Sequence, residues 1–418
     1  TLADGDLRLD RSSFEALLSL LDDQNEETPD LAPFFSYSRP RGEECLKVQN
    51  FVGVVSTDKG IQVEILPKLS KTTTPEAARE LLVRMLVELN DSPFREGTAA
   101  QLKAFRMPLF ELLLRYFLDQ DVDIVRKGVA RTYVSHEDNL VYLRGKLLLN
   151  EHIRRNSFNA AQCYCEFDEY EINRPINRLI KAALVEVAKL ARDPVNQQRC
   201  RELLFWFDGV PASKNIRLDF QRMRRDRLVQ HYSPAMPLCR LILEGMNPLT
   251  QQGHRKAISM LFPMERVFED FVAAKLPFQF KEWRVRTQVT GQALVERHIG
   301  RKIFNLRPDM ELVRGSKHLI ADTKWKLINQ ASRANKYGIS HADIYQLFAY
   351  SRKFLADQVT REVYLVYPAS DSFTRPLRPF WYEEGKDVLF VVPFDLERER
   401  LQVPSQSSLI ESEVLMAI

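Results

Sequence analysis

The sequence predicts an α+β protein with more than one domain. Its 418 residues exceed what one hydrophobic core usually organises, and 45% of them are hydrophobic, which is enough for packed interiors. Alternation of polar and apolar residues predicts strands near both ends of the chain, whereas a helical period dominates between them. We therefore expect a mixed α/β domain at 1–150, a mainly helical connecting region at 151–255 and a second α/β domain at 256–418.

Local signals place the elements of the first region. Phe51–Val55 and Ile61–Leu66 are predicted to pair as a hairpin around Asp58-Lys59-Gly60. Thr74-Pro75-Glu76 indicates the start of a helix that runs to Leu89, because proline is favoured in the first turn. Two more elements are expected: a helix at about Leu109–Leu118, and a hairpin that joins Val129–Val134 to Leu140–Leu143 through Glu137-Asp138-Asn139.

A helical period marks the middle region, and a polar stretch ends it. Gln251-Gln252-Gly253-His254 indicates a linker before the last domain, in which Val388–Val392 predicts a buried strand. The apolar positions with helical spacing are Ile176, Leu179, Ile180, Ala183, Leu184 and Val187.

The charge balance excludes a general nucleic-acid coat. There are 60 basic and 56 acidic residues, a formal net charge of +4, so any nucleic-acid surface must be local. Local basic groups could hold a phosphate backbone without reading sequence, although such groups are more often solvated faces. One group comprises Lys281, Arg284, Arg286, Arg297, Arg301 and Lys302, and another Arg217, Arg222, Arg224, Arg225 and Arg227.

Cysteine usage and hydropathy indicate a cytoplasmic protein. The five cysteines are irregularly spaced, form no C-x-x-C pair and follow no secretory signal, so we expect reduced thiols rather than disulfides or a zinc site. No apolar run approaches the roughly 18 residues that a membrane-spanning helix needs.

Two neighbouring segments of the last domain carry the chemistry. Ile303–Met310 alternates polar and apolar residues and predicts a strand that ends near Asp309, and His318–Trp325 predicts a second strand. Arg314-Gly315-Ser316-Lys317 predicts the turn of a hairpin that brings Asp309 close to Asp322. Because strand residues two apart share a face, Asp322 and Lys324 should point the same way.

These residue types suit metal-dependent cleavage of a phosphodiester. Mg²⁺ prefers oxygen ligands, which Asp309, Asp322 and the backbone carbonyl of Thr323 would supply, leaving positions for water and a phosphate oxygen. Lys324 could orient the attacking water or stabilise charge on the phosphoryl oxygens. The alternative is that Asp309 caps a strand end and that Asp322 and Lys324 form a surface ion pair.

Helices on both sides of this pattern support the nuclease interpretation. Ser340 is a candidate N-cap for a helix on which Gln346 and Tyr350 lie one turn apart. A Q-x-x-x-Y helix behind a D-x-K strand resembles the RecB-type branch of the PD-(D/E)xK nucleases. In that fold an acidic residue on the first helix often completes the site, which implies Glu269, with Glu265 in reserve, on the helix predicted at Met264–Val272. The alternative for both glutamates is solvated helix charge.

Longer blocks resemble the McrC family. They follow the family's order over roughly residues 45–370, which is most of the chain. The blocks are Gln49–Val55, Ile61–Leu69, Asn139–Leu147, His152–Asn156, Cys165–Tyr170, Pro175–Arg178, Glu265–Phe271, Asp322–Lys326 and Tyr345–Tyr350.

The resemblance implies a function and a partner. McrC is the nuclease subunit of the McrBC modification-dependent restriction system, and its partner McrB is a hexameric AAA+ GTPase that recognises DNA with modified cytosine. This chain is therefore expected to cleave DNA as its partner translocates and to stimulate the partner's GTPase. Its domain at 1–150 would contact the partner and project a loop or hairpin into the hexamer's pore. Candidate residues for that contact are Asp121, Asp123, Arg126 and Lys127. The alternative is that these residues form structural charge pairs within the chain.

The chain carries no phosphate loop of its own. Arg144-Gly145-Lys146-Leu147 lacks the first glycine and the hydroxyl of the G-x-x-x-x-G-K-[ST] motif, so GTP hydrolysis is expected from the partner.

The leading hypothesis is a Mg²⁺-dependent endonuclease subunit of a GTP-driven restriction complex, with a C-terminal PD-(D/E)xK restriction-endonuclease-like domain. Asp309, Asp322 and Thr323 would hold the metal, Lys324 would be the catalytic lysine, Glu269 an accessory acid and Gln346 a positioning residue. The alternatives are a RecB-like nuclease that acts alone or with a helicase, and a non-catalytic adaptor that activates an AAA+ motor.

Overall fold

The computed structural model describes residues 8–22, 35–56, 62–68, 74–89, 108–159, 161–223, 227–244 and 258–409. The turn predicted at Asp58-Lys59-Gly60 and the linker predicted at 251–254 lie outside these ranges. The chain forms two compact units, one from Thr1–Arg106 with Leu249–Ile418 and the other from Met107–Pro248. Both contain helices and strands, so the fold is a mixed α/β arrangement with more than one domain.

The two units differ from the predicted division at 150 and 255. The reason is a pairing between distant segments: β8 (Ile258–Pro263) runs antiparallel to β3 (Phe51–Ser56). On its other side β3 pairs with β4 (Gln62–Ile65), which confirms the predicted hairpin strands. The chain thus returns to its first sheet after completing the whole of the second unit.

The remaining N-terminal elements pack around this small sheet. Leu17, Val55, Ile65 and Leu261 form a common buried cluster. The predicted helix start at Thr74 is confirmed, because the Thr74 hydroxyl accepts a hydrogen bond from the Ala77 amide. The elements are α1 (Arg11–Asp22), β1 (Phe35–Ser38), η1 (Pro40–Gly42), β2 (Cys45–Val48) and α2 (Pro75–Val87).

A larger sheet forms the C-terminal half of the first unit. Its strand order is β15-β16-β14-β13-β12-β9, with β17 paired to β16. The three central strands, β13, β14 and β16, are parallel to one another, and β12 is antiparallel to β13. The strands are β9 (Arg284–Thr287), β12 (Met310–Arg314), β13 (Lys317–Thr323), β14 (Arg361–Pro368), β15 (Phe380–Glu383), β16 (Asp387–Asp395) and β17 (Arg400–Leu401).

Two helices cover the faces of this sheet. α11 (His341–Phe354) buries Leu347 and Tyr350 against a cluster that includes Ile320, Leu365 and Val391. α10 (Met264–Gln279) packs Phe268 and Phe271 against Phe394, with ring centroids 6.2 and 6.0 Å apart. Because strand side chains alternate between faces, Val391 and Phe394 point to opposite sides, so the two helices sandwich the sheet. The adjoining elements are β10 (Ala293–His298), β11 (Arg301–Asn305) and η4 (Arg333–Gly338).

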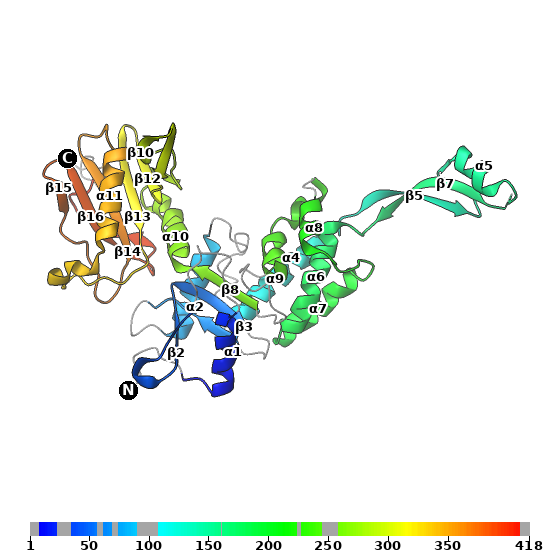
Figure 1. Ribbon diagram of the computed structural model, residues 1–418, viewed down its shortest axis with the longest axis horizontal. Helices are drawn as coiled ribbons and strands as arrows, with labels where there is room; N and C mark the ends of the chain where they lie inside the picture. Colours follow the sequence, from blue (N-terminus) through cyan, green and yellow to red (C-terminus); the bar gives the residue numbers. More distant parts are fainter. Residues whose placement is uncertain are drawn as a thin grey trace. The chain divides into compact units, whose positions relative to one another are not determined.

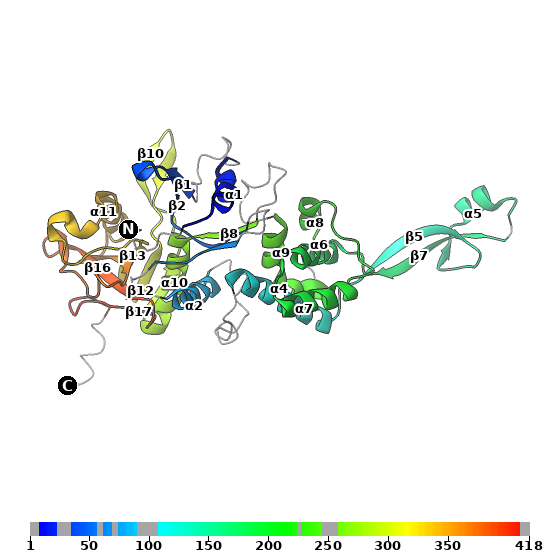
Figure 2. The ribbon, with the colours of Figure 1, turned by 90° about the horizontal axis from the view of Figure 1, so that it is seen from below.

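The second unit is a helical core with a projecting arm. In Figures 1 and 2 the paired strands β5 (Thr132–Leu140) and β7 (Cys163–Glu171) extend from the helices, with α5 (Leu149–Asn156) at the far end. The helices pack around Leu114, Phe117 and Leu184 among other buried residues. They are α4 (Leu109–Lys127), α6 (Pro175–Leu190), α7 (Pro194–Trp206), α8 (Ile216–Arg222), η2 (Arg227–Tyr232) and α9 (Ala235–Glu244), and β6 (Lys146–Leu147) pairs with β7.

The hairpin predicted at 129–143 is wrong. Thr132–Leu140 is one continuous strand, and its partner is β7 rather than 140–143. The Glu137-Asp138-Asn139 segment carries a turn signal, yet it pairs in register with Tyr164–Glu166. Pairing along the full length of β7 outweighs this weak local preference.

Among the described residues, no helix is both long and apolar enough to cross a bilayer. All five cysteines lie among the described residues and form no disulfide there.

Candidate active site

The candidate site lies at the carboxyl end of β13, where the neighbouring parallel strand β14 also ends. Asp322 and Thr323 are the last residues of β13, and Lys324 follows directly. The predicted turn is present, since Arg314 pairs with Lys317 across it. Met310 pairs with Ala321 in the same ladder, so Asp309, one position before the start of β12, stands next to Asp322. The carboxyl ends of parallel strands are where open α/β sheets bind ligands.

The strand predicted at Ile303–Met310 is wrong in part. β11 ends at Asn305, and β12 begins only at Met310, so Asp309 closes a loop instead of continuing an alternating strand. Phe304 has a φ of 58°, and Pro308 has no N–H for a ladder. The loop is held by other bonds, among them the Leu306 amide to the Gln292 carbonyl (2.9 Å).

Hydrogen bonds fix the two aspartates differently. Asp309 Oδ2 accepts from both the amide and the hydroxyl of Thr323, at 2.6 and 2.7 Å. Asp322 Oδ2 accepts from Lys324 Nζ at 2.5 Å, so Asp322 and Lys324 do point the same way. The Lys324 amide donates to the Val366 carbonyl of β14 (2.9 Å), which anchors the backbone of the site.

Burial and mutual repulsion make this an unusual group of carboxylates. Burial raises the pKa of Asp322 to about 7, and the neighbouring Asp309 adds to the shift. Burial also raises the pKa of Asp309. For Lys324, burial alone would lower the pKa, but the Asp322 carboxylate outweighs it and the pKa is raised. Such shifts in opposite-charge partners at a strand end are typical of functional sites.

Glu269 joins this group, and Glu265 does not. Glu269 is half-buried on α10, and burial, then Asp309, Asp270 and Asp322, raise its pKa to about 7. Glu265, one turn earlier, is exposed. Glu269 is thus the half-buried glutamate of α10 that interacts electrostatically with both aspartates.

Gln346 reaches the site through a tyrosine. Its side-chain amide donates to the Tyr350 hydroxyl (2.6 Å), which in turn donates to the Arg307 carbonyl (3.0 Å). α11 begins as predicted, with the Ser340 hydroxyl accepting from the Asp343 amide (3.1 Å). The pair Gln346–Tyr350 thus holds the loop that ends at Asp309.

Tyr350→Phe tests this connection. Loss of the hydroxyl leaves the Arg307 carbonyl and the Gln346 amide without their partner, which should cost about 1–3 kcal/mol of folding free energy. We expect a lower unfolding midpoint and, if this is the nuclease centre that the sequence predicts, roughly tenfold slower cleavage, because Asp309 is less well fixed. Urea unfolding and cleavage rates measure both effects. A variant with lower stability and unchanged cleavage would show that the loop needs no such support.

The residues fit a hard divalent cation. Asp322 is only 1% exposed, and its Oδ1 has no hydrogen-bond partner among the described residues. A buried carboxylate oxygen without a partner is costly, and a cation would satisfy it. Among the described residues, both hydrogen bonds that Asp309 accepts from Thr323 go to its Oδ2. Oxygen donors from two carboxylates are what Mg²⁺ prefers.

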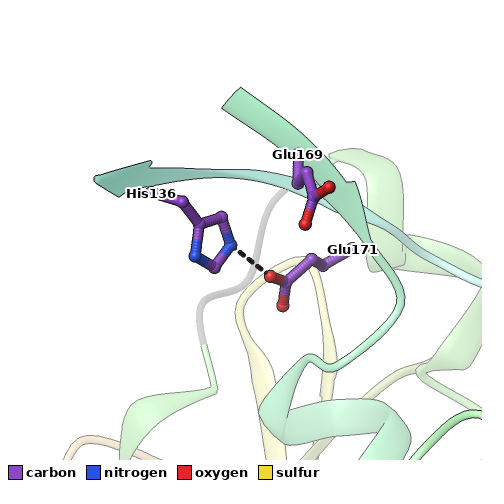
Figure 3. A group of neighbouring side chains, drawn as sticks. All are labelled: His136, Glu169 and Glu171. Carbon is purple, nitrogen blue, oxygen red and sulfur yellow. Dashed lines mark hydrogen bonds and ion pairs between the residues drawn. The ribbon is translucent and has the colours of Figure 1, made fainter. Parts of the chain in front are cut away.

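A tighter group of possible ligands lies elsewhere. Among the described residues, one group of at least three His, Cys, Asp or Glu has all its ligand atoms within 4.8 Å of one another: His136, Glu169 and Glu171, on the arm (Figure 3). Its members already have partners, because His136 Nε2 contacts Glu171 (2.5 Å) and Glu169 accepts from Arg144 (2.9 Å). It serves as a cross-strand network that joins β5 to β7.

Comparisons with known proteins identify the family. A family model described as "McrBC 5-methylcytosine restriction system component" matches residues 46–368. The chain belongs to this McrBC family. The match covers most of the chain, including both units and the candidate site, and it confirms the resemblance drawn from the sequence blocks. A comparison with curated protein sequences gave no match.

One solved structure supports the fold, and a second is similar over part of the chain. A chain in the refined half-complex from the tetradecameric assembly of Thermococcus gammatolerans McrB AAA+ hexamers with bound McrC aligns with a TM-score of 0.64 and 19% identity, over 84% of this McrBC-family chain and 79% of that one. A chain in the cryo-EM structure of the T. gammatolerans McrBC complex aligns with a TM-score of 0.44 and 23% identity, over 56% and 67%. At these identities the likeness concerns the fold alone.

Sequence reasoning missed several residues of the site. Thr323 was considered only for its backbone carbonyl and not for its hydroxyl. Tyr350 was considered only for its spacing from Gln346. The hydroxyl of Tyr367 donates to Asp343 (3.3 Å) beside the same group, and burial, followed by Asp343, raises the pKa of Tyr367 far above its usual range. A polar residue at the end of a predicted buried strand was the available signal for Thr323.

Proposed function

We propose that this chain is the Mg²⁺-dependent DNA endonuclease subunit of a GTP-driven, McrBC-like restriction complex. The observation that carries the proposal is the convergence of Asp309, Asp322 and Lys324 at the end of β13 in a chain of the McrBC family. The sheet, with α10 on one face and α11 on the other, is the arrangement expected of a PD-(D/E)xK nuclease domain.

Each residue has a role in this proposal. Asp309 and Asp322 would hold the metal, with the Thr323 carbonyl as a further oxygen ligand. Bound Mg²⁺ would polarise the phosphate and lower the pKa of a bound water. Lys324, held by Asp322, orients the attacking water and stabilises negative charge on the phosphoryl oxygens. Glu269, whose pKa lies near neutrality, can accept a proton from water at the edge of the site.

The proposed partner is a McrB-like AAA+ GTPase hexamer. One solved structure of similar fold contains such hexamers with bound McrC. In this chain the arm offers a surface for the contact, because large apolar side chains lie exposed along it. They are Tyr133, Val141, Tyr142, Leu143, Leu149, Ile153, Phe158 and Tyr170. Asp121, considered above for this contact, is fully buried and cannot make it.

The alternatives predict different dependence on the partner. A RecB-like nuclease would cut DNA without the partner or GTP. A non-catalytic adaptor would stimulate the GTPase and cut nothing, but it has no use for an unsatisfied buried carboxylate beside a paired lysine. The endonuclease proposal accounts for that arrangement and for the family.

Plasmid cleavage tests the proposal. The full chain would be mixed with its AAA+ partner, GTP and Mg²⁺ on cytosine-modified and on unmodified DNA. Cleavage that needs all three components and prefers modified DNA supports the proposal, and cleavage without partner or GTP would favour the stand-alone nuclease. Stimulated GTP hydrolysis with no cutting of either DNA would leave the adaptor.

Gly145→Ala tests the arm as the partner-binding surface. Gly145 has a φ of 70°, and a Cβ there would overlap the Glu166 carbonyl oxygen and touch Phe167. The substitution should displace the loop at 141–145 and reduce stimulation of the partner's GTPase several-fold. Gly209→Ala in the same unit, where the nearest atom is 3.9 Å away, should leave stimulation unchanged. Equal stimulation by both variants would move the contact away from this loop.

A further inference from the structure

A two-stranded ribbon stands directly beside the candidate site. In the described part of the chain, β10 and β11 pair with each other and with no other strand, in a ribbon that Figure 2 shows projecting from the larger sheet. Its base is tied to the site, because the Gln288 amide before it donates to the Asp309 carbonyl (3.1 Å). Lys353 of α11 contacts Glu296 of β10 at 3.3 Å, which fixes the ribbon against the helix that carries Gln346.

The tip of the ribbon is basic and largely uncompensated. Arg297, His298, Arg301 and Lys302 are all exposed there. The one acid of the ribbon, Glu296, is already paired with Lys302 (3.2 Å) and Lys353. Among the described residues Arg297 and Arg301 have no ion-pair partner, so two guanidinium groups at the tip are available for an external anion.

The turn at the tip carries a residue that its conformation disfavours. Ile299 has a φ of 47° and Gly300 one of 76°. A two-residue turn with both φ angles positive favours Asn-Gly, and a β-branched residue there is strained. Ile299 is also 89% exposed, so burial in the folded chain does not offset the strain. Strain of this kind, where the fold gains nothing from it, is typical of residues that act in binding.

We propose that this ribbon enters the major groove of the DNA duplex held at the nuclease site, with Arg297 and Arg301 on the flanking phosphates and Ile299 against the base edges. The proposal rests on the proposed function and names how the substrate is held. A strand of six residues spans roughly 20 Å at 3.3 Å per residue, and the major groove, about 12 Å wide, admits a two-stranded ribbon. Guanidinium groups suit phosphates, and an apolar side chain can contact the thymine methyl group.

Substitutions at the tip test this contact in the full chain with its AAA+ partner. Binding to a short duplex would be measured with Ca²⁺ in place of Mg²⁺, because Ca²⁺ has the same charge. Gels would verify that the DNA remains uncut during the measurement. Arg297→Ala with Arg301→Ala should weaken binding at least tenfold and reduce the slope of log K against log salt by about 1.8, since two phosphate contacts are lost. The control is Lys386→Ala with Arg398→Ala, which removes the same charge elsewhere in the unit and should change neither quantity.

Ile299→Asn separates binding from folding. Asparagine tolerates positive φ, so the variant should unfold at a higher temperature than the parent while it binds DNA several-fold more weakly. If Ile299 had a structural role, the substitution would instead lower both the unfolding temperature and the affinity for DNA. Guanine N7, which lies in the major groove, should be protected from dimethyl sulfate by the parent and not by the double arginine variant.

The outcomes distinguish this proposal from the proposed function. The double arginine variant could bind DNA and protect guanine N7 as well as the parent does, while the parent cleaves normally. That result would overturn the proposed role of the ribbon and leave the nuclease proposal intact. Lost GTPase stimulation with unchanged DNA binding would assign the ribbon to the protein partner and overturn the proposal. A parent complex that neither binds nor cuts DNA would contradict the proposed function itself.

Discussion

Asp322→Asn is expected to abolish DNA cleavage, with a decrease in rate of about 10³ or more, the scale of losing an electrostatic group that acts in the transition state. The substitution keeps the shape of the side chain and an oxygen for Lys324 Nζ, now 2.5 Å away. It removes the negative charge that would bind the cation, and it replaces the buried Oδ1, which has no hydrogen-bond partner among the described residues. Lys324→Ala should give a loss of similar order, because it removes the ammonium group that is hydrogen-bonded to Asp322.

Two glutamates of α10 supply a control variant and a second test. Glu265→Gln changes an exposed acid on the same helix as Glu269 and should leave cleavage unchanged, whereas Glu269→Gln should slow it less severely than Asp322→Asn. Cleavage rates with the AAA+ partner, GTP and saturating Mg²⁺ measure all four variants. Near-normal cleavage by Asp322→Asn would place the nuclease centre elsewhere, and the GTPase assay of the same variant would show whether the complex still assembles.

Asp322→Asn should also stabilise the metal-free protein at neutral pH by a few kcal/mol. The folded pKa values of Asp322 and Glu269 are both about 7, above the roughly 3.9 and 4.3 of the unfolded chain. Between about pH 4 and pH 7 the folded state therefore binds more protons than the unfolded state. Its stability falls as the pH rises through this window and stays at the lower level above it.

Thermal unfolding in EDTA checks this linkage. The variant and the parent should unfold at similar temperatures below about pH 4, where Asp322 is protonated in both states, and the variant should gain several degrees by pH 8. Mg²⁺ should stabilise the parent more at pH 8 than at pH 5 and the variant little at either pH. Glu265→Gln should follow the parent throughout. A variant that is less stable than the parent at pH 8 would mean that the Asp322–Lys324 pair outweighs the carboxylate repulsion.

Local patterns account for much of the candidate site. Asp322 and Lys324 share a side because side chains two apart on a strand do so, and Gln346 meets Tyr350 because residues four apart on a helix do so. The caps at Thr74 and Ser340 follow from hydroxyls placed before a helix. Each of these inferences depends only on neighbouring residues.

Errors occurred where distant segments compete for the same residues. The turn expected at Glu137-Asp138-Asn139 is a strand because β7 pairs with it, and the strand expected to reach Asp309 stops at Asn305. Tyr350 then bonds the Arg307 carbonyl, a partner that no local spacing could reveal. Local propensities are too weak to predict such outcomes once tertiary contacts are available.

The sequence by itself determined the McrBC family, the D-x-K strand and the helices beside it, since blocks of residues and short periods are local properties of the chain. Only the tertiary structure decided that β8 returns to β3, that Glu269 rather than Glu265 faces the aspartates, and that Asp322 is buried with an oxygen unsatisfied. These depend on which surfaces exclude water when remote segments meet, and burial sets both the pKa values and the demand for a cation.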